Sequence, residues 1–99
     1  MEIETELDAL SNSVLDAIEA RKYDEAEKLC QKLLLEYPEV ADGPMRLAML
    51  RDAQGRFQEA AQQYSKVLDT MSRQPGAFGQ EMVTYVTEQR DQALAKTKQ

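Results

Sequence analysis

The sequence predicts an all-α domain of about five antiparallel helices. Apolar residues recur at spacings of three and four along most of the chain, and no segment shows sustained strand alternation. The breaks between these segments are short, which places successive helices antiparallel to one another. The 99 residues, 42% apolar and 30% charged, suit one folded domain spanning residues 1–99.

The first two helices are predicted from their apolar stripes and their ends. The first stripe comprises Leu7, Leu10, Val14, Ala17 and Ile18, and the second comprises Ala26, Leu29, Cys30, Leu33 and Leu34. The cations of Arg21 and Lys22 suit the C-terminus of the first helix. The second helix is expected to start near Tyr23 and to close before Pro38, because proline disfavours helix in the residue before it.

Three more helices are expected in the second half of the chain. Asp42 is the expected N-cap of the third helix, and Gly55 is its expected left-handed C-cap. The fourth stripe comprises Phe57, Ala60, Ala61, Tyr64, Val67, Leu68 and Met71. A turn at Gln74-Pro75-Gly76 separates it from a last helix, Gly76 to Lys96, that is expected to include Phe78.

The second and fourth helices repeat one pattern at an offset of 34 residues. Tyr23-Asp24-Glu25-Ala26 corresponds to Phe57-Gln58-Glu59-Ala60, and Lys32-Leu33-Leu34 corresponds to Lys66-Val67-Leu68. A period of 34 with one helix–turn–helix per period is typical of the tetratricopeptide repeat, and residues 7–74 resemble that family. The expected divisions are repeat 1 at 7–40, repeat 2 at 41–74, a capping helix at 75–96 and a polar tail at 97–99.

Some positions fit the family pattern and others depart from it. The resemblance implies small residues where helices cross, and Ala26, Ala48 and Ala60 meet that need. Arg21 stands where the first unit usually has its turn glycine, and Arg51 stands at a site that is usually aromatic.

The resemblance also implies a concave groove lined by the first helix of each unit and by the capping helix. The candidate groove residues are Asn12, Leu15, Ile18, Met45, Arg46, Met49, Val83 and Val86. Met45 and Met49 are four residues apart and so share a helix face, and methionine is common on surfaces that receive apolar helices. The alternative is that these apolar residues are core, with the last helix filling the groove.

The resemblance implies a function in protein–protein interaction. The chain is expected to act as an adaptor or small chaperone that binds a helical or extended peptide segment of another protein in its groove. The alternative is a structural subunit whose apolar surfaces are buried in a homodimer or larger assembly. Some family members bind a chaperone's carboxylate tail through paired Lys and Asn side chains. Asn12 matches one such position, but Asp8 stands where a Lys is needed and Arg46 where an Asn is needed, so this ligand is not expected.

Composition argues against catalysis and against several partner classes. The chain has no histidine and one cysteine, Cys30, so we expect no disulfide, metal site, cofactor or catalytic set. The net charge is −6, and residues 1–20 hold six carboxylates without a Lys or Arg, which disfavours nucleic acid and anionic lipid as partners. The acidic start and the shortness of the apolar runs, such as Leu33-Leu34-Leu35, predict a cytoplasmic protein without a membrane span.

Overall fold

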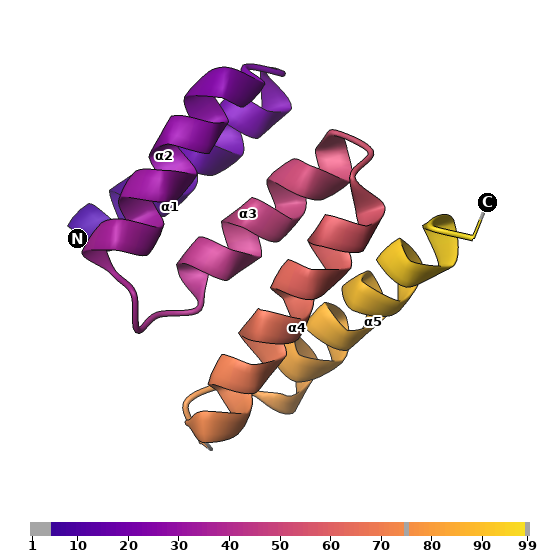
Figure 1. The fold of residues 1–99 in the computed structure, drawn as a ribbon. Coiled ribbons are helices and arrows are strands. Elements are labelled where there is room, and N and C mark those ends of the chain that lie inside the picture. The colour runs from indigo at the N-terminus through magenta and orange to yellow at the C-terminus, as the bar shows by residue number, and fades with distance from the viewer. Residues whose placement is uncertain (1–4, 75, 99) are drawn as a thin grey trace.

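The computed structural model describes residues 5–74 and 76–98, and it contains five α-helices in that part of the chain (Figure 1). Glu2 and Glu4 of the acidic start, Pro75 of the expected turn and Gln99 of the tail lie outside the described residues. The helices are α1 (Glu6–Glu19), α2 (Tyr23–Glu36), α3 (Asp42–Ala53), α4 (Phe57–Arg73) and α5 (Gln80–Lys96). The all-α prediction is therefore confirmed, and no strand occurs in the described residues.

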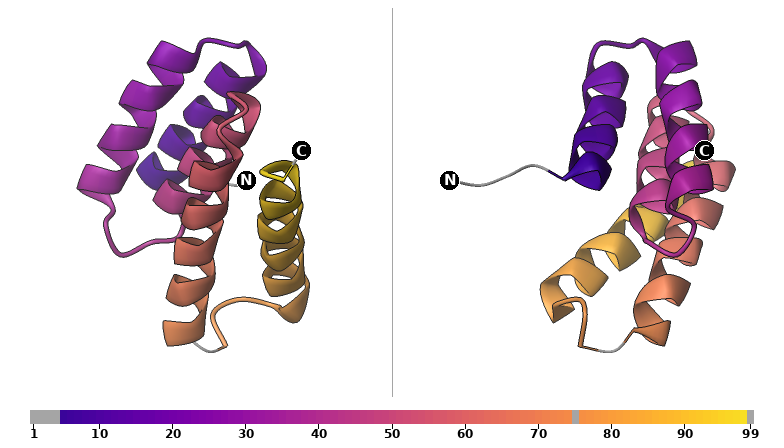
Figure 2. Two further views of the ribbon diagram at one scale, coloured as in Figure 1. Left: turned by 45° about the vertical axis from the view of Figure 1, so that its right-hand side comes forward. Right: turned by 90° about the vertical axis from the view of Figure 1, so that its left-hand side faces the viewer.

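The helices form two antiparallel hairpins, α1–α2 and α3–α4, and α5 packs along α4. In Figure 2, the right-hand view shows α1 and α5 on one side of the molecule and α2 and α4 on the other. No helix in the described residues combines the length and the apolarity needed to cross a bilayer.

Two apolar clusters hold the hairpins together, and α3 contributes to both of them. Leu47 and Leu50 pack into the α1–α2 cluster around Val14 and Leu33, whereas Ala48 packs into the cluster formed by α4 and α5. A helix buried on two faces needs apolar residues on both, which explains why the apolar stripe of α3 is less distinct in the sequence than that of α4. The three alanines expected at helix crossings, at positions 26, 48 and 60, are all fully buried.

The two hairpin turns have the same geometry at the 34-residue offset. The amide of Arg21 donates to the Ile18 carbonyl at 3.0 Å, and that of Gly55 donates to the Asp52 carbonyl at 3.0 Å. Both residues are left-handed, with φ of 60° at Arg21 and 77° at Gly55. Gly55 has the expected left-handed conformation but follows the C-cap, which is Gln54, whereas Arg21 adopts with a side chain the conformation that favours glycine.

Arg51 joins three helices at the site where the family usually has an aromatic residue. Its Nη1 donates to Glu27 Oε1 of α2 at 2.6 Å and to Gln54 Oε1 at 3.0 Å, and its Nε lies 3.7 Å from Glu59 Oε2 of α4. The hydrogen bond from Arg51 is the main cause that lowers the pKa of Glu27 below its ordinary value. An ion pair here replaces the apolar contact that an aromatic side chain would make.

Two helix starts differ from the sequence prediction. Asp42 is the first residue of α3 rather than its N-cap, because Ala41 occupies the cap position and the start has no side-chain cap hydrogen bond. The last helix begins at Gln80 rather than Gly76, and Phe78 lies in the preceding connection, packed against the α4–α5 cluster. Gly76 has a φ of 88°, which excludes it from a right-handed helix.

Candidate binding groove

The position of α5 opens a groove along α3. Helix α1 packs against α3, but α3 and α5 do not form a packed helix pair. The preceding helix, α4, has 17 residues where its counterpart α2 has 14. The three extra residues carry the chain almost one more turn along α4 before it reverses, which shifts the start of α5 along the axis of α4.

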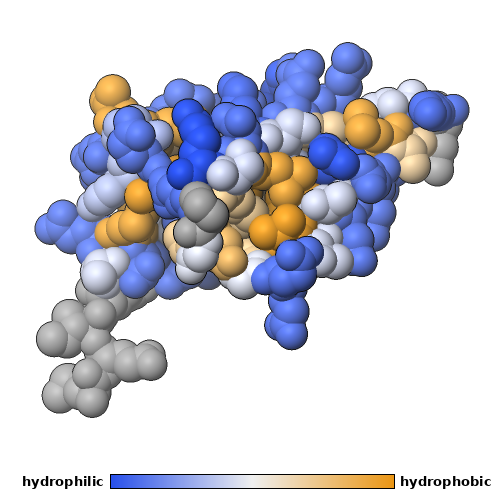
Figure 3. All heavy atoms as spheres, turned by 90° about the horizontal axis from the view of Figure 1, so that it is seen from below, coloured by the Kyte–Doolittle hydropathy of each residue, from blue (hydrophilic) through white to orange (hydrophobic). Residues whose placement is uncertain are grey.

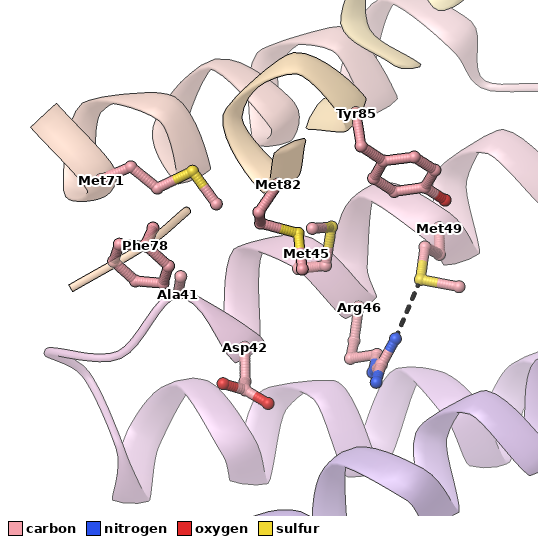
Figure 4. Close-up of a pocket in the computed structure, with 9 residues that line it drawn as sticks. All are labelled: Ala41, Asp42, Met45, Arg46, Met49, Met71, Phe78, Met82 and Tyr85. Atoms are coloured by element: carbon pink, nitrogen blue, oxygen red, sulfur yellow. Dashed lines mark hydrogen bonds between the residues drawn. The ribbon is translucent and has the colours of Figure 1, made fainter. Parts of the chain in front are cut away.

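A hollow of about 270 Å³ lies between α3, the α4–α5 connection and α5 (Figure 4). We call it the methionine groove, and its lining residues are Ala41, Asp42, Met45, Arg46, Met49, Met71, Phe78, Met82 and Tyr85. Four of the five methionines of the chain line this groove. Seen from below, the face of the molecule where α3 and α5 begin carries apolar side chains near its centre with polar side chains around them (Figure 3).

The wall of the methionine groove formed by α5 is exposed. Met82 and Tyr85 keep 45% and 49% of their surface accessible, values expected of polar rather than large apolar side chains. Met71 is buried, and Met45 is partly buried against the α4–α5 cluster, so these residues form the floor. In Figure 4, Met82 of α5 and Met45 of α3 point toward one another across the groove.

A polar edge separates the methionine groove from α1. Arg46 Nε donates to Ser11 Oγ of α1 at 2.9 Å, and Arg46 Nη1 donates to Met49 Sδ at 3.2 Å (Figure 4). Ser11 is buried, so the Arg46 side chain fastens α1 to α3 and holds the Met49 thioether in place. This arrangement gives Arg46 a positioning role at the edge of the groove.

A second hollow continues the groove past Met49 and Tyr85. We call it the upper hollow; its volume is about 430 Å³, and it is lined by Leu15, Ile18, Glu19, Met49, Asp52, Ala53, Tyr64, Tyr85, Gln89 and Lys96. At its far end Lys96 Nζ lies 3.6 Å from Asp52 Oδ1 and 5.0 Å from the centre of the Phe57 ring. Because both hollows share Met49 and Tyr85, they form one concave surface that runs between α1, α3 and α5.

Most of the residues predicted for the groove meet on this surface. Met45, Arg46 and Met49 line the methionine groove, and Leu15 and Ile18 line the upper hollow. Asn12 is exposed on α1 but lines neither hollow.

The prediction for α5 needs correction. Val86 is fully buried between α4 and α5 and cannot contact a ligand, and Val83 is partly buried against the same cluster. Besides Lys96 at the far end, the residues that α5 presents to the concave surface are Met82, Tyr85 and Gln89, none of which was predicted for the groove. Their spacing of three and four was visible in the sequence, but the repeat offset could not choose between the two faces because α5 starts 38 residues after α3 rather than 34.

The described residues contain no cluster of three or more His, Cys, Asp or Glu side chains placed to hold a metal ion. Cys30 is fully buried, and burial raises the pKa of its thiol to about 11. A thiol with so high a pKa is almost wholly protonated near neutral pH, so Cys30 acts as a small apolar core residue.

Stacked helical hairpins with an apolar concave face define the chain as a helical-repeat binding scaffold. The profile of the tetratricopeptide repeat family matches residues 17–75, more than half of the chain. The chain therefore belongs to the tetratricopeptide repeat family, whose repeats are protein–protein interaction modules. Comparisons with curated proteins and with solved structures gave no significant match.

Proposed function

We propose that this chain is an adaptor or small chaperone that binds a helical or extended apolar segment of a partner protein in the methionine groove. The observation that carries the proposal is the exposure of Met82 and Tyr85, which face Met45 and Met49 across a hollow. An apolar segment laid in the groove would remove these side chains from water. Fully burying one large apolar side chain is worth about 1.5–3 kcal/mol, so two half-exposed ones contribute a few kcal/mol to a complex.

The thioethers suit a groove that accepts more than one apolar shape. Methionine is unbranched and polarizable, and it repacks around different partners at low cost. Helix-in-groove recognition uses this property, with the partner's apolar residues at spacings of three and four as anchors. A cytoplasmic location is part of the proposal, and the buried, reduced thiol of Cys30 is compatible with it.

A structural subunit is the second candidate, and it rests on a different surface. Leu35 on α2 is 82% exposed and Leu94 on α5 is 43% exposed, and neither lines the methionine groove. Apolar residues outside the groove would be covered in a homodimer or a larger assembly. Sedimentation of the wild type and of Leu35→Glu distinguishes the candidates, because an assembly built on these surfaces dissociates in the variant.

The test of groove binding uses peptides selected from a random displayed library against the immobilised protein. Binding is then followed through the ¹³C-methyl signals of Met45, Met49, Met71 and Met82, which report on the groove directly. The double substitution Met82→Glu plus Tyr85→Glu places two carboxylates against the bound apolar segment. Desolvating unpaired charges costs several kcal/mol, so affinity should fall by more than about a hundredfold.

The control variant is Leu35→Glu, which also replaces an exposed apolar side chain by a carboxylate but lies on α2, outside the groove. It should bind the selected peptides as the wild type does, and both variants should retain the wild-type helical signal in circular dichroism. Peptides that bind the double variant as tightly as the wild type would refute the groove assignment.

A further inference from the structure

We propose that the segment bound in the groove is a basic amphipathic helix, with an apolar stripe flanked by Lys or Arg. The inference rests on the proposed function and adds the charge of the partner. Its basis is a rim of carboxylates, the acidic rim, that borders the two hollows on three helices: Asp8, Glu19, Asp42, Asp52, Glu81 and Glu88.

The structure places the members of the acidic rim on both sides of the concave surface. Asp42 lines the methionine groove, and Glu19 and Asp52 line the upper hollow. Asp8 lies on α1 at the helical spacing of seven from Leu15, so it shares the face that carries Leu15. Glu81 and Glu88 are exposed on α5, four residues before and three residues after Tyr85, which places them beside the exposed ring.

Few cations oppose this rim. Within the part of the chain that the structure describes, the cations that line the two hollows are Arg46 and Lys96. Arg46 donates to Ser11, and Lys96 pairs with Asp52, so the excess of negative charge comes from the other five members of the acidic rim. Helix α1 holds four carboxylates, of which Asp8 and Glu19 belong to the acidic rim, and no Lys or Arg. A concave apolar surface bordered by an excess of one charge concentrates ligands of the opposite charge.

The dimensions of the groove fit a short helix. Helix α3, which forms its length, has 12 residues and is therefore about 18 Å long. A partner helix of about three turns would lay its apolar stripe on the methionines. Lysine and arginine stems lie along apolar surface while their charged ends reach outward, so the flanking cations of such a helix would meet the acidic rim.

Charge distinguishes a basic helix from the other ligands that could cover the concave surface. A second copy of the chain docked through the same surface would bring two acidic rims together, which costs several kcal/mol for like charges at an interface. An anionic lipid surface would be repelled for the same reason. A basic segment of a different protein meets both the apolar and the electrostatic demands of the surface.

The experiment uses three model helical peptides that share one leucine stripe and carry only Lys, only Gln or only Glu on their flanks. Affinity is measured by calorimetry, and the site by the methyl signals of Met45, Met49 and Met82. We expect the Lys peptide to bind at least about tenfold tighter than the Gln peptide, with the difference shrinking as the ionic strength rises from about 0.05 to about 0.5 M. A Gln peptide that binds as tightly as the Lys peptide overturns the inference and leaves groove binding intact. If none of the three shifts the groove methyl signals, the proposed function fails with it.

Matched variants distinguish the effect of the acidic rim on binding from the effect of the net charge of the protein. Glu19→Gln plus Glu88→Gln removes two rim charges, and Asp24→Asn plus Glu25→Gln removes two charges at the start of α2. Only the rim pair should reduce the preference for the Lys peptide, by about threefold or more, and an equal effect of both pairs overturns the inference.

A third variant, Met82→Glu, adds a carboxylate inside the methionine groove. It should weaken binding of the Lys peptide, because the leucine stripe then faces a charge. Tighter binding by this variant would show that only general electrostatic attraction is at work, and would refute the inference.

Discussion

Replacing Arg21 by glycine should stabilise this protein, although it removes a side chain from a helix end. Arg21 has a φ of 60° and Gly55, its counterpart 34 residues later, has a φ of 77°. A side chain in the left-handed region costs about 1–2 kcal/mol, and the greater freedom of glycine in the unfolded chain offsets about 0.5–1 kcal/mol of that gain. The expected net gain for Arg21→Gly is about 0.5–1 kcal/mol, which raises the Tm by about 2–8 °C in a domain of this size.

The reverse substitution, from glycine to a residue with a side chain, tests the same backbone strain and should lower the stability instead of raising it. A Cβ added at Gly55 meets no atom within 4 Å, so Gly55→Ala introduces backbone strain without a steric clash. By the same two contributions, backbone strain and glycine freedom, it should cost about 0.5–1 kcal/mol. Arg21→Gln is the matched control, because it removes the charge and keeps the Cβ, and its free energy of unfolding should lie within about 0.5 kcal/mol of the wild type.

The assay is urea unfolding followed by circular dichroism at neutral pH, with the slope of the transition checked for a common unfolded state. If Arg21→Gly is no more stable than Arg21→Gln, the left-handed conformation at position 21 carries no strain, and the equivalence of the two turns is only geometric.

Three further predictions concern the packing of the repeats. Glu27→Gln weakens the contact with Arg51 and should cost about 1 kcal/mol at pH 7, a modest value because the Glu27 side chain is 35% exposed. Because Arg51 lowers the pKa of Glu27 below 4.5, this contribution is present above that pH and is lost as the pH falls through the lowered pKa, so unfolding curves of wild type and variant should converge in acid. Cys30 should resist a thiol reagent at pH 8 until the protein unfolds, since its thiol is buried with a pKa of about 11, and labelling at the rate of a free thiol would contradict that burial. Ala26→Leu and Ala60→Leu should each cost about 1–3 kcal/mol in thermal melts by overpacking fully buried crossings, and neutral effects at both would show that neither site is a close crossing.

The five helices and the repeat could be predicted from the sequence because both depend on local chemistry. The spacing of apolar residues sets the buried face of each helix, and Gly55 marks the first turn of the second unit through its own backbone preference. The buried alanines at positions 26, 48 and 60 could be predicted in the same way, because a small side chain at these sites allows two helices to approach closely. Met45 and Met49 were assigned to the groove surface by that register, and both line it.

The wall of the groove formed by α5 could not be predicted in this way. Its sequence carries apolar residues on two faces, with Val83 and Val86 on one and Met82 and Tyr85 on the other. Which face is buried depends on where α5 meets α4, and α5 reaches α4 through a connection that packs Phe78 against the α4–α5 cluster. The sequence by itself therefore determined the helices, their pairing and the α3 side of the concave surface. Only the tertiary structure decided which residues of α5 are exposed, because a helix with two apolar faces is oriented by the surface it packs on rather than by its own periodicity.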